Sequence, residues 1–275
     1  MTSLAEDTGT VCSKSQDPKV RFRRVEVIYP GEQGGEAVHA LEGIDLAVRE
    51  GEFVSLIGPS GCGKSTLLRV LADLTKPTAG DVWISSEAPR TARLKRKVGF
   101  VFQDAALLEW RRVLANVSLP LEIQGVSRGD RQARAHDLIR LVGLTGFENA
   151  FPRQLSGGMR QRAAIARAMS TNPEVMLMDE PFGALDQITR DRLNMELLEL
   201  SQSQRMTVLF VTHSIREAVL LSDRVAVMTS RPGRITEVID IDLPRPRTLE
   251  TRETAAFEKL SRSGVQLLEQ GFGSS

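Results

Sequence analysis

The sequence of 275 residues has little cysteine, few aromatic side chains and almost no net charge. Its cysteines are Cys12 and Cys62, too few for a disulfide framework or a multi-cysteine zinc site. Aromatic residues make up 5% of the chain, with Tyr29 as the single tyrosine, which argues against a stacking platform for single-stranded nucleic acid. The formal charge of +1 provides no overall basic field. We therefore expect no nucleic-acid partner.

Long hydrophobic runs are missing as well. No stretch approaches the roughly 20 apolar residues that a membrane helix needs. Residues 1–19 are polar and lack the apolar segment of a secretory signal. We expect these residues to form a disordered tail on a cytoplasmic protein, so that any role at a membrane comes through a partner.

Strand and helix patterns alternate along most of the chain. Continuous apolar runs predict buried parallel strands at Phe53–Ile57, Val98–Phe102, Val175–Met178, Thr207–Val211 and Val225–Met228. Apolar and charged residues alternate over Val20–Tyr29, which predicts a strand with one solvent-exposed face. A second strand is predicted at Leu41–Val48 and a turn over residues 30–35. Helices are predicted over Lys64–Leu74, Val113–Leu121, Arg131–Leu141, Met159–Met169, Asp186–Ser201, Ile215–Leu221 and Leu249–Gln270. This order predicts an α/β fold with a mainly parallel sheet, a helical insertion at about 104–169 and a helical tail at 246–275.

A phosphate-binding loop is predicted by two glycines five residues apart, followed by lysine and serine. Its residues are Gly58, Pro59, Ser60, Gly61, Cys62, Gly63, Lys64, Ser65 and Thr66. The glycines allow a tight turn whose N–H groups point at phosphate oxygens, and the helix that follows adds the positive end of its dipole. In this pattern Lys64 reaches the β- and γ-phosphates and the Ser65 hydroxyl binds magnesium. The alternative, a glycine-rich surface turn, is disfavoured because the motif follows an apolar strand and opens a helix.

The apolar run Val175–Met178 ends in two acids, Asp179 and Glu180. A buried strand that ends in a carboxylate is the expected partner of a phosphate loop, and its first acid holds the magnesium ion. Glu180 is then placed to accept a proton from an attacking water as a general base. The alternative is a strand end with two solvated acids. The phosphate loop earlier in the chain favours the functional interpretation.

The segment Leu155–Arg162 (LSGGMRQR) resembles the signature motif of ATP-binding cassette (ABC) ATPases, and it precedes the acidic strand end as in that family. Ser156 can cap the helix that follows, and two glycines bring a bare helix N-terminus up to an anion. In the family this anion is the γ-phosphate of an ATP held by a second copy. The resemblance therefore implies a head-to-tail dimer with two ATP molecules at its interface. The residues that would contact the partner's ATP are Ser156, Gly157, Gly158, Gln161 and Asp186.

Further motifs match the family in order. Tyr29 resembles the aromatic residue that stacks on adenine; the alternative is a surface tyrosine at a strand end. Gln103 resembles the glutamine that contacts magnesium and water and senses the membrane partner. Gly183–Asp186 (GALD) resembles the loop that couples the two sites of the dimer, and His213 resembles the switch histidine that contacts the γ-phosphate.

The resemblance covers roughly residues 20–245 and implies an ATPase that uses ATP and Mg²⁺. It implies a P-loop NTPase core with a mainly parallel sheet, an N-terminal antiparallel β subdomain and an inserted helical subdomain. The magnesium ligands would be Ser65, Gln103 and Asp179, and the catalytic residues Lys64, Glu180 and His213.

Residues 102–117 and Met228–Arg234 resemble the cassette subunits of nitrate, sulfonate, taurine, bicarbonate and pyrimidine-precursor importers. Glu109 departs from that group, whose members often have proline before the tryptophan. The resemblance implies uptake of a small solute through separate permease subunits, with a soluble substrate-binding protein as an indirect partner. The chain would sit at the cytoplasmic face of the membrane. An exporter or lipid-transport cassette and a cassette ATPase without a transporter, such as one for iron–sulfur cluster assembly, are the alternatives.

Overall fold

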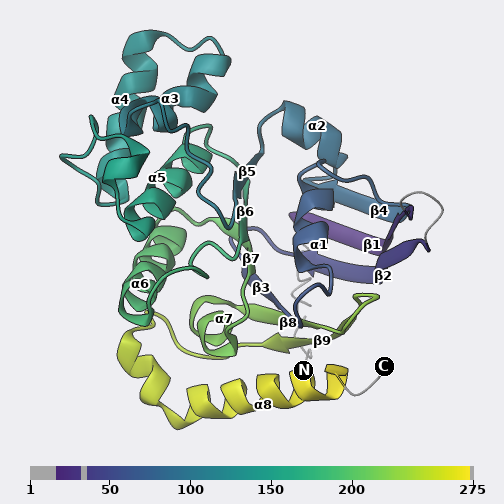
Figure 1. The fold of residues 1–275 in the computed structure, drawn as a ribbon. Coiled ribbons are helices and arrows are strands. Elements are labelled where there is room, and N and C mark those ends of the chain that lie inside the picture. Colours follow the sequence, from purple (N-terminus) through teal and green to yellow (C-terminus); the bar gives the residue numbers. More distant parts are fainter. Residues whose placement is uncertain (1–16, 32–35, 273–275) are drawn as a thin grey trace, which may run out of the picture.

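The structure is a computed structural model that describes residues 17–31 and 36–272. Its elements form two sheets with helices between and around them (Figure 1). Sheet A is antiparallel, in the order β2 (Val38–Val48), β1 (Val20–Tyr29) and β4 (Ala79–Ile84). Sheet B has the order β5 (Val98–Val101), β6 (Val175–Asp179), β7 (Thr207–Val211), β3 (Phe53–Ile57), β8 (Arg224–Met228) and β9 (Ile235–Asp240). Its strands are parallel except for β9, which confirms the predicted mainly parallel sheet and antiparallel N-terminal sheet.

The central strands β6, β7 and β3 of sheet B are buried at every position because other elements cover both faces. Helix α1 (Lys64–Leu71) packs between the two sheets, whereas α6 (Gln187–Ser203) lies on the opposite side of sheet B (Figure 1). Side chains alternate between the faces along each strand. On β6, Val175 and Leu177 join the core around α1, whereas Met176 and Met178 join the core around α6. This two-sided burial explains why the runs show no polar alternation.

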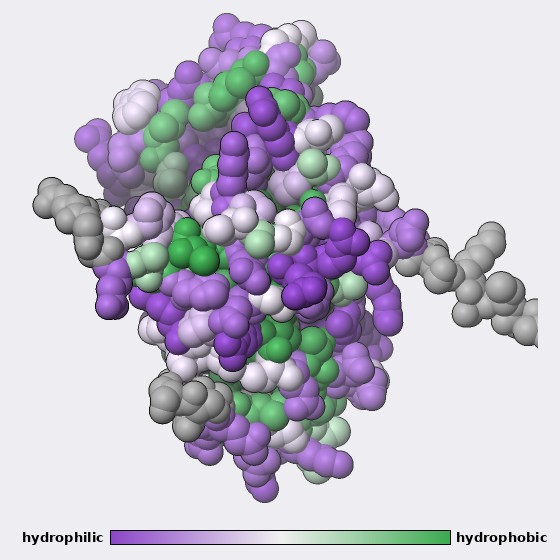
Figure 2. Space-filling model, turned by 90° about the vertical axis from the view of Figure 1, so that its right-hand side faces the viewer, coloured by the Kyte–Doolittle hydropathy of each residue, from purple (hydrophilic) through white to green (hydrophobic). Residues whose placement is uncertain are grey.

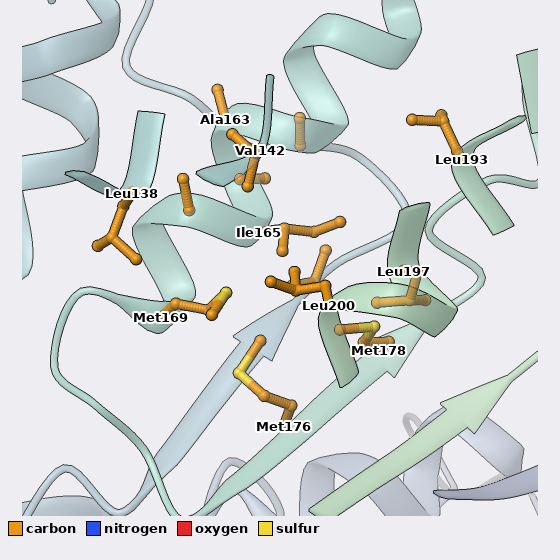
Figure 3. Close-up of a cluster of buried hydrophobic side chains, with 14 of the residues drawn as sticks. Leu138, Val142, Ala163, Ile165, Met169, Met176, Met178, Leu193, Leu197 and Leu200 are labelled. Carbon is orange, nitrogen blue, oxygen red and sulfur yellow. The ribbon is translucent and has the colours of Figure 1, made fainter. Parts of the chain in front are cut away.

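Only helical elements lie between β5 and β6. They are α3 (Val113–Ile123), α4 (Arg128–Leu141), the 3₁₀ turn η2 (Pro152–Gln154) and α5 (Gly157–Met169). Figure 3 shows how this region is attached: Met176 and Met178 of β6 point toward Ile165 of α5 and Leu200 of α6. The helices and the sheet therefore share one apolar core.

The C-terminal segment packs on its own chain. Helix α8 (Ala255–Phe272) follows the 3₁₀ turn η3 (Leu249–Glu253) and runs along α7 (Ile215–Leu221), with Phe257 fully buried. The guanidinium of Arg247, which precedes η3, is also buried, and this desolvation lowers its pKa to about 10. It donates to the carbonyl oxygens of Val219, Leu220, Ser222, Ile241 and Leu243.

Apart from the short turn η2, three elements were not predicted from the sequence: β4, β9 and α2 (Pro89–Leu94). Strand β4 begins with three exposed residues, β9 is an exposed edge strand, and α2 has only six residues, so none has a strong periodic pattern. The predicted helix Lys64–Leu74 is too long, because Asp73 takes a left-handed conformation (φ 56°) and leaves Leu74 55% exposed. The predicted helix Leu249–Gln270 is divided into η3 and α8 at Thr254. The other predicted strands and helices are confirmed, whereas the predictions for residues 1–16 and 32–35 lie outside the described residues.

The surface is mostly hydrophilic on the face that Figure 2 shows, with apolar residues in separate patches. Among residues 17–31 and 36–272, no helix combines the length and hydrophobicity that crossing a membrane requires.

An ion-pair cluster around Glu174 connects sheet A to sheet B, because Lys19 precedes β1 and Lys97 precedes β5. Partial burial would raise the pKa of Glu174, but bonds from Lys19 (2.7 Å), Ser85 (2.7 Å) and Lys97 (3.1 Å) lower it to about 2. The folded pKa thus lies below the unfolded value near 4.5, so the stabilisation is present above pH 4.5 and lost as the pH falls toward 2.

We predict that Glu174→Gln lowers the free energy of unfolding at pH 7 by about 1 kcal/mol, a value reduced for solvent screening of the partly exposed pairs. Urea titrations at pH 7, 5 and 3 should show the difference from the wild-type protein shrinking below pH 4.5. Asp137→Asn, which breaks the exposed pair with Arg140, is the matched control and should change stability much less. An unchanged difference at pH 3 would contradict the assignment.

Candidate nucleotide-binding site

The loop Gly58–Thr66 connects the carboxyl end of β3 to α1, as the sequence predicts. Its shape requires glycine at position 63, where φ is +102°. A Cβ atom there would lie 2.5 Å from Leu41 Cδ2 and 2.8 Å from the Ala40 carbonyl oxygen, both on β2. Sheet A therefore closes directly against the loop. Tyr29 pairs with Val38 at this end of sheet A and is 36% exposed, so its ring is open to a ligand.

Lys64 holds its ammonium group inside the loop. The side chain is 4% exposed, and Nζ donates to the carbonyl oxygens of Gly58 and Pro59, each at 2.8 Å. No acidic residue stands in the first turn of α1, so the positive end of the helix dipole is not offset there. A buried cation beside a helix N-terminus suits a phosphate group.

The acidic strand end lies beside the loop because β6, β7 and β3 are parallel neighbours. Ser65 Oγ donates to Asp179 Oδ1 at 2.7 Å. Glu180, with φ of +49°, turns away from the strand, and its N–H donates to the Val211 carbonyl at 3.0 Å. Its Oε1 lies 2.7 Å from Nε2 of His213, which follows β7. The structure thus brings together the residues predicted for phosphate binding and water activation.

The donor set at this edge fits a magnesium ion. A serine hydroxyl and a carboxylate within 2.7 Å of each other offer hard oxygen ligands, and Mg²⁺ in such sites takes one or two protein ligands together with phosphate oxygens and waters. Gln103 follows β5, the neighbour of β6, and is exposed. Its position after β5 places it at the same edge as Asp179.

A second group of predicted residues surrounds the start of α5. Ser156 caps this helix and accepts from the Met159 N–H at 3.3 Å. A Cβ atom on Gly157 would lie 2.9 Å from Leu185 Cδ2, so the helix start touches the Gly183–Asp186 loop. Two residues of this group, Gly157 and Gln161, line a hollow of about 320 Å³. Its other lining residues also lie outside the phosphate loop: Gln103, Asp104, Ala105, Arg160, Pro181, Ala184 and Leu185.

Gln161 and Asp186 both make contacts within their own chain. Gln161 is 6% exposed, and its Nε2 donates to the Gln103 carbonyl at 2.7 Å. Asp186 caps α6 and accepts from the Thr189 N–H at 3.0 Å, and the hydrogen bonds from Thr189 lower its pKa. Gln161 therefore ties the α5 group to the backbone at Gln103, whereas Asp186 remains exposed.

Sequence reasoning missed Thr212 and Glu217, which flank His213 in the structure. Both are buried, and the Thr212 hydroxyl donates to the Glu217 carboxylate. A signal was present: Ser214 and Glu217 have the spacing of a capping box directly after the histidine.

The model of the ABC transporter family matches residues 41–183. The chain is 50% identical over 241 residues to an uncharacterized ABC transporter ATP-binding protein of Methanocaldococcus jannaschii, covering 88% of this chain and 90% of the relative. It is 45% identical to a taurine import ATP-binding protein of Rhizobium johnstonii, covering 86% and 88%. It is 40% identical to an aliphatic sulfonates import ATP-binding protein of Bacillus cereus, covering 88% and 93%.

Solved structures give the same result. The fold is similar, with a TM-score of 0.72 and 36% identity, to a dimeric ATP-binding cassette in a post-hydrolysis state bound to ADP and phosphate. The match covers 82% of this chain and all of that one. Together with the phosphate loop and the LSGGMRQR segment, these comparisons establish that the chain belongs to the ABC transporter family of ATP-binding cassette ATPases.

Proposed function

We propose that the chain is the ATP-hydrolysing subunit of an importer and couples ATP hydrolysis to uptake of a small solute through separate permease subunits. The observation that carries the hydrolytic part is the grouping of Lys64, the Ser65–Asp179 pair and the Glu180–His213 pair at one edge of sheet B. The relatives named for taurine and aliphatic sulfonate import support the importer part and a solute of the nitrate, sulfonate or taurine type.

In the proposed reaction the ATP phosphates lie on the amides of Gly58–Thr66, and adenine stacks on Tyr29. Lys64 offsets the charge of the β- and γ-phosphates. Mg²⁺ held by Ser65, Asp179 and Gln103 would supply further positive charge to the same oxygens. This positioning and charge stabilisation are what phosphoryl transfer chiefly requires.

Glu180 acts on the attacking water. Its carboxylate accepts a proton as the water oxygen bonds to the γ-phosphorus, and the bond to the β,γ-bridging oxygen breaks to release ADP and phosphate. His213, 2.7 Å from Glu180 Oε1, steadies the γ-phosphate and holds the base in place.

The site is proposed to be completed by a second copy. Within one chain Gly157, between Ser156 and Gly158, lines a hollow whose lining includes no residue of the phosphate loop. A head-to-tail dimer would place this turn, with Gln161 and Asp186 beside it, on the γ-phosphate of the partner's ATP. The dimeric cassette among the structural relatives supports this arrangement. Hydrolysis then removes the anion that joins the copies, and the dimer opens.

The membrane partner is proposed to dock beside Trp110. This ring is 74% exposed, whereas Leu107 nearby is buried in the core of the helical region. An exposed tryptophan next to the Gln103 segment is suited to an apolar contact from a permease. The chain would then be a peripheral subunit at the cytoplasmic face of the membrane, with a substrate-binding protein as an indirect partner.

We predict that Glu180→Gln lowers the steady-state ATPase rate at least about 100-fold, because the amide cannot accept the proton. ATP binding should persist, and size-exclusion chromatography with ATP and Mg²⁺ should show a stable dimer. Glu199→Gln, an exposed substitution on α6, is the control. Undiminished turnover in Glu180→Gln would exclude the general-base role.

We predict that Ser156→Asp prevents ATP-driven dimerisation in the Glu180→Gln background, whereas Ser156→Asn permits it. Both side chains cap a helix, so α5 should form in each variant, but the aspartate adds a negative charge next to the partner's γ-phosphate. Binding of a fluorescent ATP analogue to the monomer should be similar in the two. Equal dimerisation of both variants would contradict a contact in trans.

Affinity purification from gently extracted membranes of the native cell should recover a multi-span permease with a substrate-binding protein. Trp110→Glu should no longer recover the permease but should keep basal ATPase activity. The control Val265→Glu, at an exposed apolar position on α8, should still recover the permease. A permease without a binding protein would favour an exporter. Recovery with scaffold proteins and no permease would contradict the transport role.

A further inference from the structure

A cluster of buried polar side chains lies between α6, α7 and the C-terminal segment, directly behind His213. Glu217 of α7 is 6% exposed, Thr212 is 4% exposed and Asn194 of α6 is fully buried. None of these three residues belongs to the phosphate-binding set described above. Buried ionisable groups are costly unless they are paired, so the position of Glu217 calls for a physical reason.

Glu217 controls the backbone on both sides of His213. Its carboxylate accepts from the Thr212 hydroxyl, and Thr212 Oγ1 in turn accepts from the Ser214 N–H at 3.0 Å. The Glu217 N–H donates to Ser214 Oγ at 3.3 Å. The side-chain hydrogen bonds of the residues before and after the histidine therefore form one chain that ends at Glu217.

This arrangement is a capping box lengthened by one hydroxyl. In the ordinary form the glutamate side chain reaches the N–H of the cap residue itself. Here Thr212 is inserted between them, so the bond also fixes the last residue before His213. Strand β7 ends at Val211, and Thr212 N–H still donates to the Leu56 carbonyl of β3 at 3.3 Å, so the Thr212 hydroxyl joins the sheet edge to the start of α7.

The Glu217 carboxyl lies among groups of α6 and η3. Burial raises its pKa, and Thr212, Asn194, Arg190 and Arg252 offset this only in part. Arg190 also donates to the carbonyl oxygens of Gly183 and Leu185, and Arg252 of η3 pairs with Asp191 at 2.5 Å. A carboxylate buried here at a desolvation cost, where an apolar side chain would bear none, argues that the cluster serves more than stability.

We propose that Glu217 is a positioning residue for ATP hydrolysis, which acts through the Thr212 hydroxyl to hold the His213 imidazole against Glu180. The proposal rests on the roles proposed above for Glu180 and His213. It predicts that loss of the Glu217–Thr212 bond slows turnover without weakening ATP binding, because the phosphate loop lies on other elements.

The test compares two pairs of variants by steady-state kinetics and thermal unfolding. Thr212→Val and Glu217→Ala remove the bond, whereas Thr212→Ser and Glu217→Gln retain a hydroxyl and an acceptor. We expect the first two to lower kcat about tenfold or more with KM within about twofold, since a small misplacement of a reacting group can cost up to about 100-fold. The conservative variants should recover most of the rate.

Glu258→Ala is the matched control, because it also removes a carboxylate that contacts α7, through the surface pair with Arg216 at 2.5 Å. It should leave kcat unchanged. Wild-type kcat in Thr212→Val and Glu217→Ala would overturn the proposal. So would a loss that Thr212→Ser and Glu217→Gln fail to recover, or one that appears equally in Glu258→Ala, because a loss of either kind is a general effect on folding.

His213→Ala and Glu180→Gln, measured beside these variants, separate the positioning role of Glu217 from the proposed catalytic roles of His213 and Glu180. If both lose turnover and the Glu217–Thr212 variants do not, only the positioning role fails. If both retain turnover, the proposed catalytic roles fail and the positioning role fails with them.

Discussion

The parallel register of three strands is the constraint on which the site depends. Leu56 of β3 and Asp179 of β6 both pair with Val211 of β7, so the three strands end at the same level. The residues that follow them therefore meet at one edge of sheet B, although β3 ends more than a hundred positions before β6 begins. A shift of one residue in either pairing would separate the Ser65 hydroxyl from the Asp179 carboxylate and turn alternate side chains to the other face.

The register is in turn held by two cores on opposite faces of the sheet. Met176 and Met178 pack toward α5 and α6, and Val175 and Leu177 pack toward α1 and sheet A. Burial on both faces makes the pairing specific, since any slip would exchange the two sets of side chains. The same contacts attach the helical region to the site, because α5, capped by Ser156, lies beside the Gln103 segment. Movement of that region would thus be transmitted to the edge that carries the proposed magnesium ligands.

Three charged groups around sheet B are buried, and each is held by neighbours. Lys64 is bonded to two carbonyls and Glu217 to Thr212. Arg247 is bonded to five carbonyls, three at the end of α7 and two after β9. Buried charges contribute little net stability but fix geometry when their partners are in place. The C-terminal segment belongs to this set: Arg247 and α8 secure α7, the helix that follows His213. The C-terminal segment therefore stabilises the helix next to the site and places none of its own residues in the site.

Local pattern in the sequence was sufficient for the phosphate loop, the acidic strand end and the cap at Ser156, because each depends on residues within a few positions of one another. The same is true of the buried strands, whose apolar runs carry their own signal. Strands β4 and β9 were not predicted because they are stabilised by pairing with other strands rather than by their own composition. The sequence also could not place the start of α5 on a hollow apart from its own phosphate loop, nor bring Thr212, Glu217 and Asn194 together in one buried cluster. Those arrangements involve residues from separate elements, and only the packing of the complete core determines which of them meet.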